Sequence, residues 1–208
     1  MLEIAKEYEG AELGDPRRSR RLARLESDGS AGWGDQPSVD ARLRAADVDL
    51  NPWERLETFR MALSGNCRAH TLTTSFSGTR TGLDFELTGH LPGCLQLDRG
   101  WSGVVRRMRF SDTPLGDWQL DQNLPLTLRD GVVRSGSACL WTPAAPGRLC
   151  LNELEAGARG SASVAFNSVP LDLLLLPADP VFRLGTPLRG AARFGWDGNG
   201  VRDINAEL

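Results

Sequence analysis

Apolar and polar residues alternate with a period of two from about residue 38 onward, and turn residues interrupt the pattern at intervals of roughly ten residues. In "GLDFELTGHL", this alternation places Leu83, Phe85 and Leu87 on one face and Asp84 and Glu86 on the other. The segments "VVRRMRFS", "LPLTLRD" and "SASVAFNSV" repeat it. The pattern predicts an all-β chain built from antiparallel strands.

The apolar faces of these strands are thin, and many outward positions carry Arg, Asp, Thr or Ser. Each sheet of a β-sandwich must bury a full side against the other sheet, which requires heavier apolar faces. We therefore expect an elongated antiparallel sheet that curls on itself into a groove. A closed core would use the same apolar residues. The candidates are Leu83, Phe85, Leu87, Met108, Phe110, Leu126, Leu128, Val164 and Phe166.

The N-terminal segment, residues 1–27, differs from the rest of the chain. In "GDPRRSRRLARLESDG", Asp15 suits a helix N-cap, Pro16 suits the first helical position, and Leu22 and Leu25 recur at helical spacing. The following "SDGSAGWGDQPS" is rich in Gly, Ser and Asp, which is typical of a linker. We predict a short basic helix in residues 1–27 and an antiparallel β domain in residues 28–208.

Two cysteines flank a Pro/Gly-rich turn in "SACLWTPAAPGRLC". Cys139 and Cys150 are equidistant from its centre, so a simple hairpin places them opposite each other, with Leu140 opposite Leu149. Opposed residues at a non-hydrogen-bonded site of an antiparallel pair are close enough for a disulfide. The spacing therefore predicts a cross-strand disulfide.

Cys67 and Cys94 are likewise equidistant from a turn, "GTRT", and this symmetry places Phe76 opposite Phe85. Two symmetric pairs favour disulfides and therefore an oxidising compartment. The alternative, four buried free thiols in a cytosolic protein, stays open at this point.

The sequence contains no catalytic motif that we can identify. His70 and His90 are the only histidines, neither has metal-ligand spacing, and we interpret both as strand residues that face water. There is no nucleophile elbow, no phosphate-binding P-loop and no dinucleotide-binding glycine motif, and the carboxylates are scattered singly. We therefore expect no enzymatic activity, no cofactor and no metal.

No apolar run approaches the roughly 20 residues that cross a bilayer. The acidic start "MLEIAKEYEGAELGD" lacks the basic region and apolar core of a signal peptide. We expect this chain to carry neither a membrane span nor a signal peptide of its own, so that an exported form would be part of something longer. The formal net charge of −3 indicates no general attraction to nucleic acid.

The order of motifs over about residues 30–208 resembles the TamB family of translocation and assembly modules. The shared parts are a "WxG" strand start at Trp101 and Gly103, "GDWQL" at residues 116–120, the cysteine hairpin ending in "LC", and an apolar "PLDLL" stretch. The resemblance implies a β-taco fold and a non-enzymatic bridge across the periplasm, anchored in the inner membrane in the full-length family.

The same resemblance implies a function and partners. The groove of such a bridge carries phospholipid acyl chains to the outer membrane or assists outer-membrane protein assembly, and the full-length family pairs with an Omp85-type outer-membrane barrel. On this interpretation the chain is a fragment, without the membrane anchor and without the region that meets the barrel.

The segment "YEGAELGDPRRSRRLARL", residues 8–25, resembles the N-terminal DNA-binding segment of a cut-and-paste transposase. That resemblance implies that Arg17, Arg18, Arg20 and Arg21 meet backbone phosphates from a short helix. The alternative function is therefore a DNA-binding fragment of a transposase-like protein, with nucleic acid as its partner. A solvated basic helix face is the simpler interpretation of the same arginines.

Overall fold

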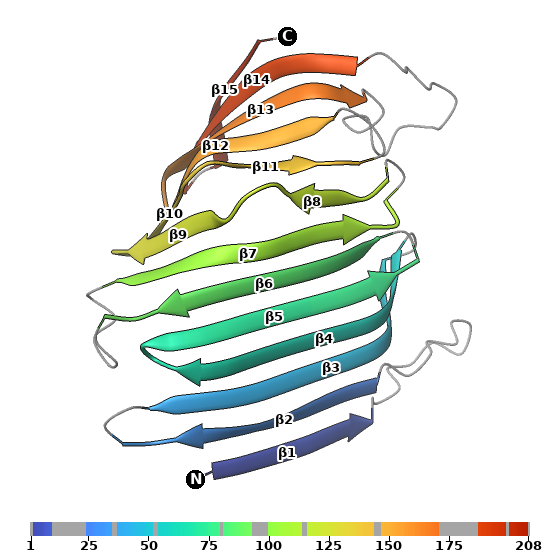
Figure 1. The fold of residues 1–208 in the computed structure, drawn as a ribbon, viewed down its shortest axis with the longest axis vertical. Helices are drawn as coiled ribbons and strands as arrows, with labels where there is room; N and C mark the ends of the chain where they lie inside the picture. Colours follow the sequence, from blue (N-terminus) through green and yellow to red (C-terminus); the bar gives the residue numbers. More distant parts are fainter. Residues whose placement is uncertain are drawn as a thin grey trace.

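The computed structural model describes residues 2–9, 24–34, 37–51, 54–79, 81–92, 100–113, 116–143, 147–170, 187–198 and 200–207. The regular structure in these residues is all β-strand and forms one 15-stranded antiparallel sheet (Figure 1). The strands are β1 (Leu2–Glu9), β2 (Arg24–Gly32), β3 (Ser38–Asn51), β4 (Glu54–Asn66), β5 (Ala69–Gly78), β6 (Gly82–His90), β7 (Trp101–Ser111), β8 (Trp118–Leu120), β9 (Leu124–Arg129), β10 (Val132–Ser135), β11 (Ala138–Trp141), β12 (Arg148–Ala156), β13 (Gly160–Pro170), β14 (Pro187–Asp197) and β15 (Gly200–Glu207).

The sheet is a meander in which two long strands are interrupted. Both β8 and β9 pair with β7, and their registers differ by one residue, so they are two halves of one strand broken at residues 121–123. The halves β10 and β11 form the next strand, which is broken at Gly136 and Ser137 and pairs with β12. When β8 and β9 are counted as one strand, and β10 and β11 as the next, all the pairings are between successive strands. Alternation and regularly spaced turns predict this arrangement for antiparallel hairpins.

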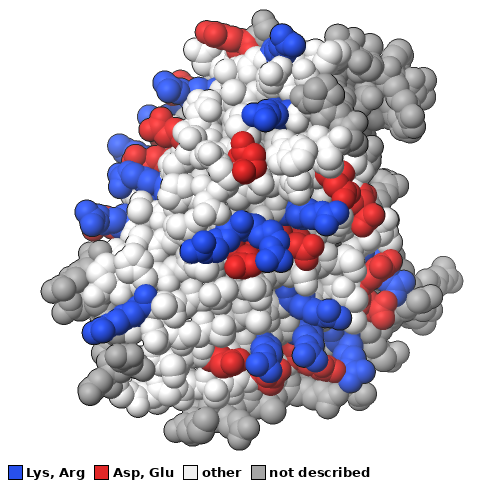
Figure 2. Space-filling view, viewed as in Figure 1, with Lys and Arg blue, Asp and Glu red and all other residues white. Residues whose placement is uncertain are grey.

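The strand registers align apolar side chains on one face of the sheet and polar side chains on the other. Directly opposed residues form rows that run across the sheet, roughly perpendicular to the strands. One apolar row contains Ala45, Phe59, Phe76, Leu83, Phe110 and Trp118. A polar row contains Asp28, Arg42, Ala62, Thr73, Glu86 and Arg107. Figure 2 shows charged side chains of both signs gathered in the middle of one face.

The sheet is a curved single layer with a small core. Its C-terminal strands turn away from the plane of the central strands (Figure 1). The accessible surface is 14681 Å², whereas a compact monomer of 22.7 kDa exposes about 9,500 Å². The described hydrophobic residues that are buried are Leu56, Cys67, Val105, Trp118, Leu124, Ala138 and Val169. This confirms the prediction of an all-β, curled antiparallel sheet.

The structure corrects the prediction for the N-terminal segment. Residues 2–9 and 24–32 are strands, and the centre of the predicted helix lies outside the described residues. The proposed boundary near residue 28 falls inside β2, where Asp28 pairs with Arg42. Gly29, which lies in the predicted linker, is packed closely against β3. A Cβ at this position would lie 2.8 Å from the carbonyl oxygen of Asp40, so the position needs glycine.

The predicted register of the β5–β6 hairpin is also wrong. Phe76 lies opposite Leu83, and Phe85 lies opposite Thr74. The amide of Gly78 donates to the carbonyl oxygen of Thr81 at 2.9 Å, so the hairpin is centred on "GTRT" itself. The midpoint between Cys67 and Cys94, on which the prediction rests, lies one residue later in the chain. Turn geometry, which the cysteine spacing does not report, sets the register here.

Candidate functional site

The structure brings all nine predicted groove residues to one face of the sheet. On the N-terminal side, Leu83 lies opposite Phe110, and Phe85 lies opposite Met108. Further along, Leu126 and Leu128 of β9 lie opposite Gly103 and Trp101. In the C-terminal strands, Val164 and Phe166 lie opposite Leu151 and Leu149. Leu149 continues the row that contains Leu120 and Leu140, which joins the two halves of the face.

Most residues of this apolar face are partly buried. Leu128 is 39% exposed, and the other eight predicted residues are half-buried. Val105 of β7, Leu124 of β9 and Ala138 of β11 form a buried cluster on this face, and Trp118 and Val169 are buried outside it. Phe85, Leu87, Met108, Leu120, Leu126 and Leu151 pack against this cluster. The described strands all belong to this one sheet, so within the described residues no second sheet covers the face.

An apolar hollow lies at one end of this face. It encloses about 460 Å³, and Val39, Leu63 and Leu91 contribute to its wall. Trp33, also in the wall, is 80% exposed, which is unusual for so large an apolar side chain. His70 also lines the hollow. The hollow is therefore a mainly apolar recess that opens to solvent.

His70, which the sequence predicts to face water, is half-buried on the apolar face. Its Nε2 accepts a hydrogen bond of 2.7 Å from Nε1 of Trp101, and its Nδ1 lies 3.3 Å from the carbonyl oxygen of Asn66. The indole N–H can only donate and the backbone carbonyl can only accept, so these contacts fix the orientation of the His70 ring. By contrast, His90 is exposed and contacts the hydroxyl of Ser102 at 3.0 Å. The bond to Trp101 joins strands that are distant in sequence, so strand alternation alone could not reveal it.

The indole of Trp101 lies over two glycines of the apolar face. A Cβ on Gly89 would lie 2.5 Å from its Cζ2, and a Cβ on Gly103 would lie 2.3 Å from its Cη2. Atoms cannot approach so closely, so both positions need glycine. The "WxG" spacing at the start of β7 is therefore a packing motif, in which the tryptophan covers the glycine two residues later.

The two interrupted strands are held together by Asp121. Its amide donates to the carbonyl oxygen of Cys139 at 2.9 Å, and its Oδ1 accepts from the amide of Cys139 at 2.9 Å. Nε2 of Gln122 donates to the carbonyl oxygen of Ser137 at 3.0 Å. Side-chain atoms thus form hydrogen bonds with the backbone groups that lose their regular strand-to-strand partners at the interruption.

The predicted cysteine hairpin lies directly beside this break. Cys139 and Cys150 are opposed in register and joined by a disulfide, with their Cα atoms 3.9 Å apart. Leu140 lies opposite Leu149, as the turn symmetry predicts. Cys67 is also disulfide-bonded, and its predicted partner Cys94 lies outside the described residues. None of the described cysteines is a free thiol.

The polar face carries exposed ion pairs. Arg107 pairs with Glu86 at 2.9 Å, and Arg109 pairs with Asp117 at 2.6 Å. The hydrogen bond from Arg109 lowers the pKa of the Asp117 carboxyl below its ordinary value. Within the described ranges, no group of three or more His, Cys, Asp and Glu side chains is placed to hold a metal ion.

A family model described as "TamB, N-terminal domain" matches residues 18–208. The chain belongs to the TamB family. Proteins of this family are periplasmic modules of transport and assembly, anchored in the inner membrane, with a bridge-like role. Comparisons with the curated proteins and with the solved structures gave no match.

The TamB match also bears on the N-terminal segment. It begins at residue 18 and so includes Arg18, Arg20 and Arg21 of the transposase-like stretch, although not Arg17. All four arginines lie outside the described residues. In the part of the chain that the structure describes, no helix has the length and apolar character of a membrane span.

Proposed function

We propose that the apolar face of this TamB domain is a groove that shields phospholipid acyl chains on their way across the periplasm. The observation that carries the proposal is the continuity of apolar rows across a sheet that, within the described residues, has no second sheet packed on that face. The row from Ala45 to Trp118 crosses six neighbouring strands, which at about 4.8 Å per step is roughly 24 Å.

The mechanism needs no bond-making chemistry. Each methylene that leaves water gains about 0.8 kcal/mol, so an acyl chain against the apolar rows is stabilised along its whole length. The half-buried state of Leu83, Phe110 and Phe166 leaves apolar surface for such contacts. The groove lowers the barrier to transfer by replacing water along the path, while the polar face on the other side of the sheet stays in contact with water.

The disulfide at Cys139–Cys150 supports a periplasmic location, because disulfides persist in oxidising compartments. As the partner of full-length members of the TamB family, we propose an Omp85-type outer-membrane barrel that receives the lipid or the assembling barrel protein. The chemistry of the groove favours acyl chains as its direct ligand.

The test is crosslinking to a photoactivatable phospholipid. Phe59→Asp and Phe110→Asp place a charge on the apolar rows, and Thr88→Asp places one on the polar face, where Arg106 Nε already donates to the Thr88 hydroxyl at 3.2 Å. A desolvated carboxylate without a partner is costly, so labelling should fall in the first two variants and persist in the third.

Phe59 and Phe110 are better test positions than Phe85. Phe85 packs against the buried cluster, so a charge there disturbs folding as well as lipid contact. Circular dichroism and thermal unfolding establish that each variant is folded before labelling is compared. Equal labelling of all the folded proteins would mean that the apolar face carries no lipid, and the proposal would fail.

A further inference from the structure

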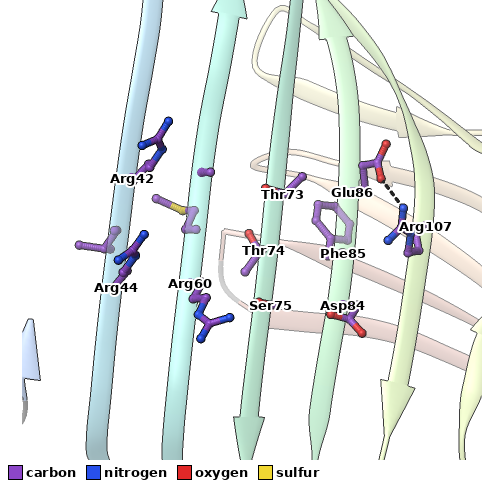
Figure 3. A pocket seen from close by; sticks show the side chains of 13 residues that line it. Arg42, Arg44, Arg60, Thr73, Thr74, Ser75, Asp84, Phe85, Glu86 and Arg107 are labelled. Atoms are coloured by element: carbon purple, nitrogen blue, oxygen red, sulfur yellow. Dashed lines mark hydrogen bonds and ion pairs between the residues drawn. The ribbon is translucent and has the colours of Figure 1, made fainter. Parts of the chain in front are cut away.

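A second hollow, of about 350 Å³, lies on the polar face over β3–β7, opposite to the proposed groove. In Figure 3, Arg42, Arg44 and Arg60 stand on one side of it, and Thr73 and Ser75 lie in its middle. The other side carries Asp84, Glu86 and Arg107. Its volume is in the range of small-molecule sites.

Arg44 and Arg60 are directly opposite each other on adjacent strands. Like charges in this position destabilise a sheet. Neither guanidinium forms an ion pair with another described residue, and both side chains are exposed. Two cations thus face the same hollow with no described carboxylate between them.

Most carboxylates around the hollow have other partners. Glu86 pairs with Arg107 at 2.9 Å. Asp84, on β6, lies opposite Arg109 and two strands away from Arg60. On the β2 side, Glu26 lies opposite Arg44 but pairs with Arg24 at 2.7 Å. Asp28 and Asp40 lie 3.8 and 3.5 Å from the guanidinium nitrogens of Arg42. The excess positive charge is therefore localised on Arg44 and Arg60.

The residues beside Arg44 and Arg60 supply hydroxyl donors and leave space for a ligand in the hollow. Ser75 lies opposite Arg60, and Thr73 lies opposite Ala62, whose methyl group is the smallest side chain of the lining. Guanidinium groups present planar forks of donors that match phosphate oxygens, and such charge-assisted bonds are about twice as strong as neutral ones. This combination suits a tetrahedral oxyanion.

We propose that Arg44 and Arg60 bind the phosphate group of a phosphorylated ligand in this hollow, with Ser75 and Thr73 as additional donors. The phosphate belongs either to a soluble phosphate ester or to a phospholipid headgroup, since both present the same oxygens. The site lies on the face opposite to the apolar groove, so it does not depend on acyl-chain binding there.

The experiment compares the whole chain with two double variants. Arg44→Gln/Arg60→Gln removes the proposed site, and Arg189→Gln/Arg193→Gln removes two exposed arginines from one face of β14 as the matched control. Binding of inorganic phosphate is measured by calorimetry, and binding to phosphatidylglycerol vesicles by cosedimentation, both at about 0.15 M ionic strength to screen distant charges. Thermal unfolding verifies folding, and Arg60→Gln alone is used if the double variant is unstable.

We expect the affinity of the Arg44→Gln/Arg60→Gln variant to fall about tenfold or more, while the control binds like wild type. Phosphate binding without vesicle binding assigns the site to a soluble phosphate ester. Vesicle binding that the same variant loses, without binding of free phosphate, assigns it to a headgroup. The proposal is overturned if wild type binds neither probe, or if both double variants bind alike.

Discussion

The backbone of Cys139 and the residue Asp121 are joined by two hydrogen bonds of 2.9 Å, one from the amide of Asp121 and one to its carboxylate. They bridge the point where the strand containing β8 and β9 is interrupted. The Cys139–Cys150 disulfide begins at the same residue. Cys139 is therefore fixed on one side by a carboxylate and on the other by a covalent bond, beside the break in the meander.

The first prediction concerns the carboxylate of Asp121. Asp121→Ala removes the acceptor for the Cys139 amide, and a lost backbone partner at this exposed site should reduce the free energy of unfolding by about 1 kcal/mol. Urea unfolding measures the effect. Asp203→Ala, on the exposed strand β15, is the control and should change stability little. If both variants unfold at the same urea concentration as wild type, Asp121 does not hold the break together.

The second prediction concerns the disulfide. Cys139→Ala/Cys150→Ala opens a loop with a sequence separation of 11 residues, and the chain-entropy relation gives a loss of about 3 kcal/mol. The thermal transition should fall by several degrees, and reduction of the wild type should reproduce part of that change. Peptide mapping without reduction should recover the two cysteines in one linked fragment. Free alkylation of both in folded, periplasmically expressed protein would contradict the structure.

A third prediction tests the packing of Trp101. Gly103→Ala places a methyl group where the indole now lies, so either the ring or the strand must move, at a cost of about 1–3 kcal/mol. Gly198→Ala is the control, because a Cβ there meets no atom within 4 Å. Denaturant unfolding of the two variants gives the comparison. Similar stabilities would show that the indole of Trp101 is not packed against Gly103.

The fourth prediction follows from the lowered pKa of Asp117, caused first by its hydrogen bond with Arg109. Because the folded value lies below the unfolded one, the stabilisation is complete above the ordinary carboxyl pKa, near 4, and is lost as pH falls through the lowered value. Unfolding between about pH 2 and 6 should therefore show a smaller acid dependence in Asp117→Asn than in wild type. The difference should be small and should shrink in high salt, because the pair is exposed. Identical pH profiles at low salt would refute it.

The alternation of residues by itself determines the main features of this protein. Leu83, Phe85 and Leu87 share a face because successive strand side chains point in opposite directions, and this local rule holds whatever the neighbouring strands are. The Cys139–Cys150 register follows from the symmetry of one short turn, which is also local. The order of motifs along the chain likewise indicates the TamB family without reference to contacts between distant strands.

Tertiary structure decided what depends on partners distant in the sequence. The segment around Gly29 has the composition of a linker, yet it is a strand because β3 supplies hydrogen bonds and the glycine allows close approach. The hydrogen bond that His70 accepts comes from Trp101, which lies 31 residues further along the chain. Arg44 and Arg60 face each other across β3 and β4, while the nearby Glu26 and Glu86 pair with other arginines. Periodicity assigns a side chain to one face of the sheet. Which charged side chains lie opposite each other on that face depends on the strand register, and the geometry of the turns that join the strands sets this register.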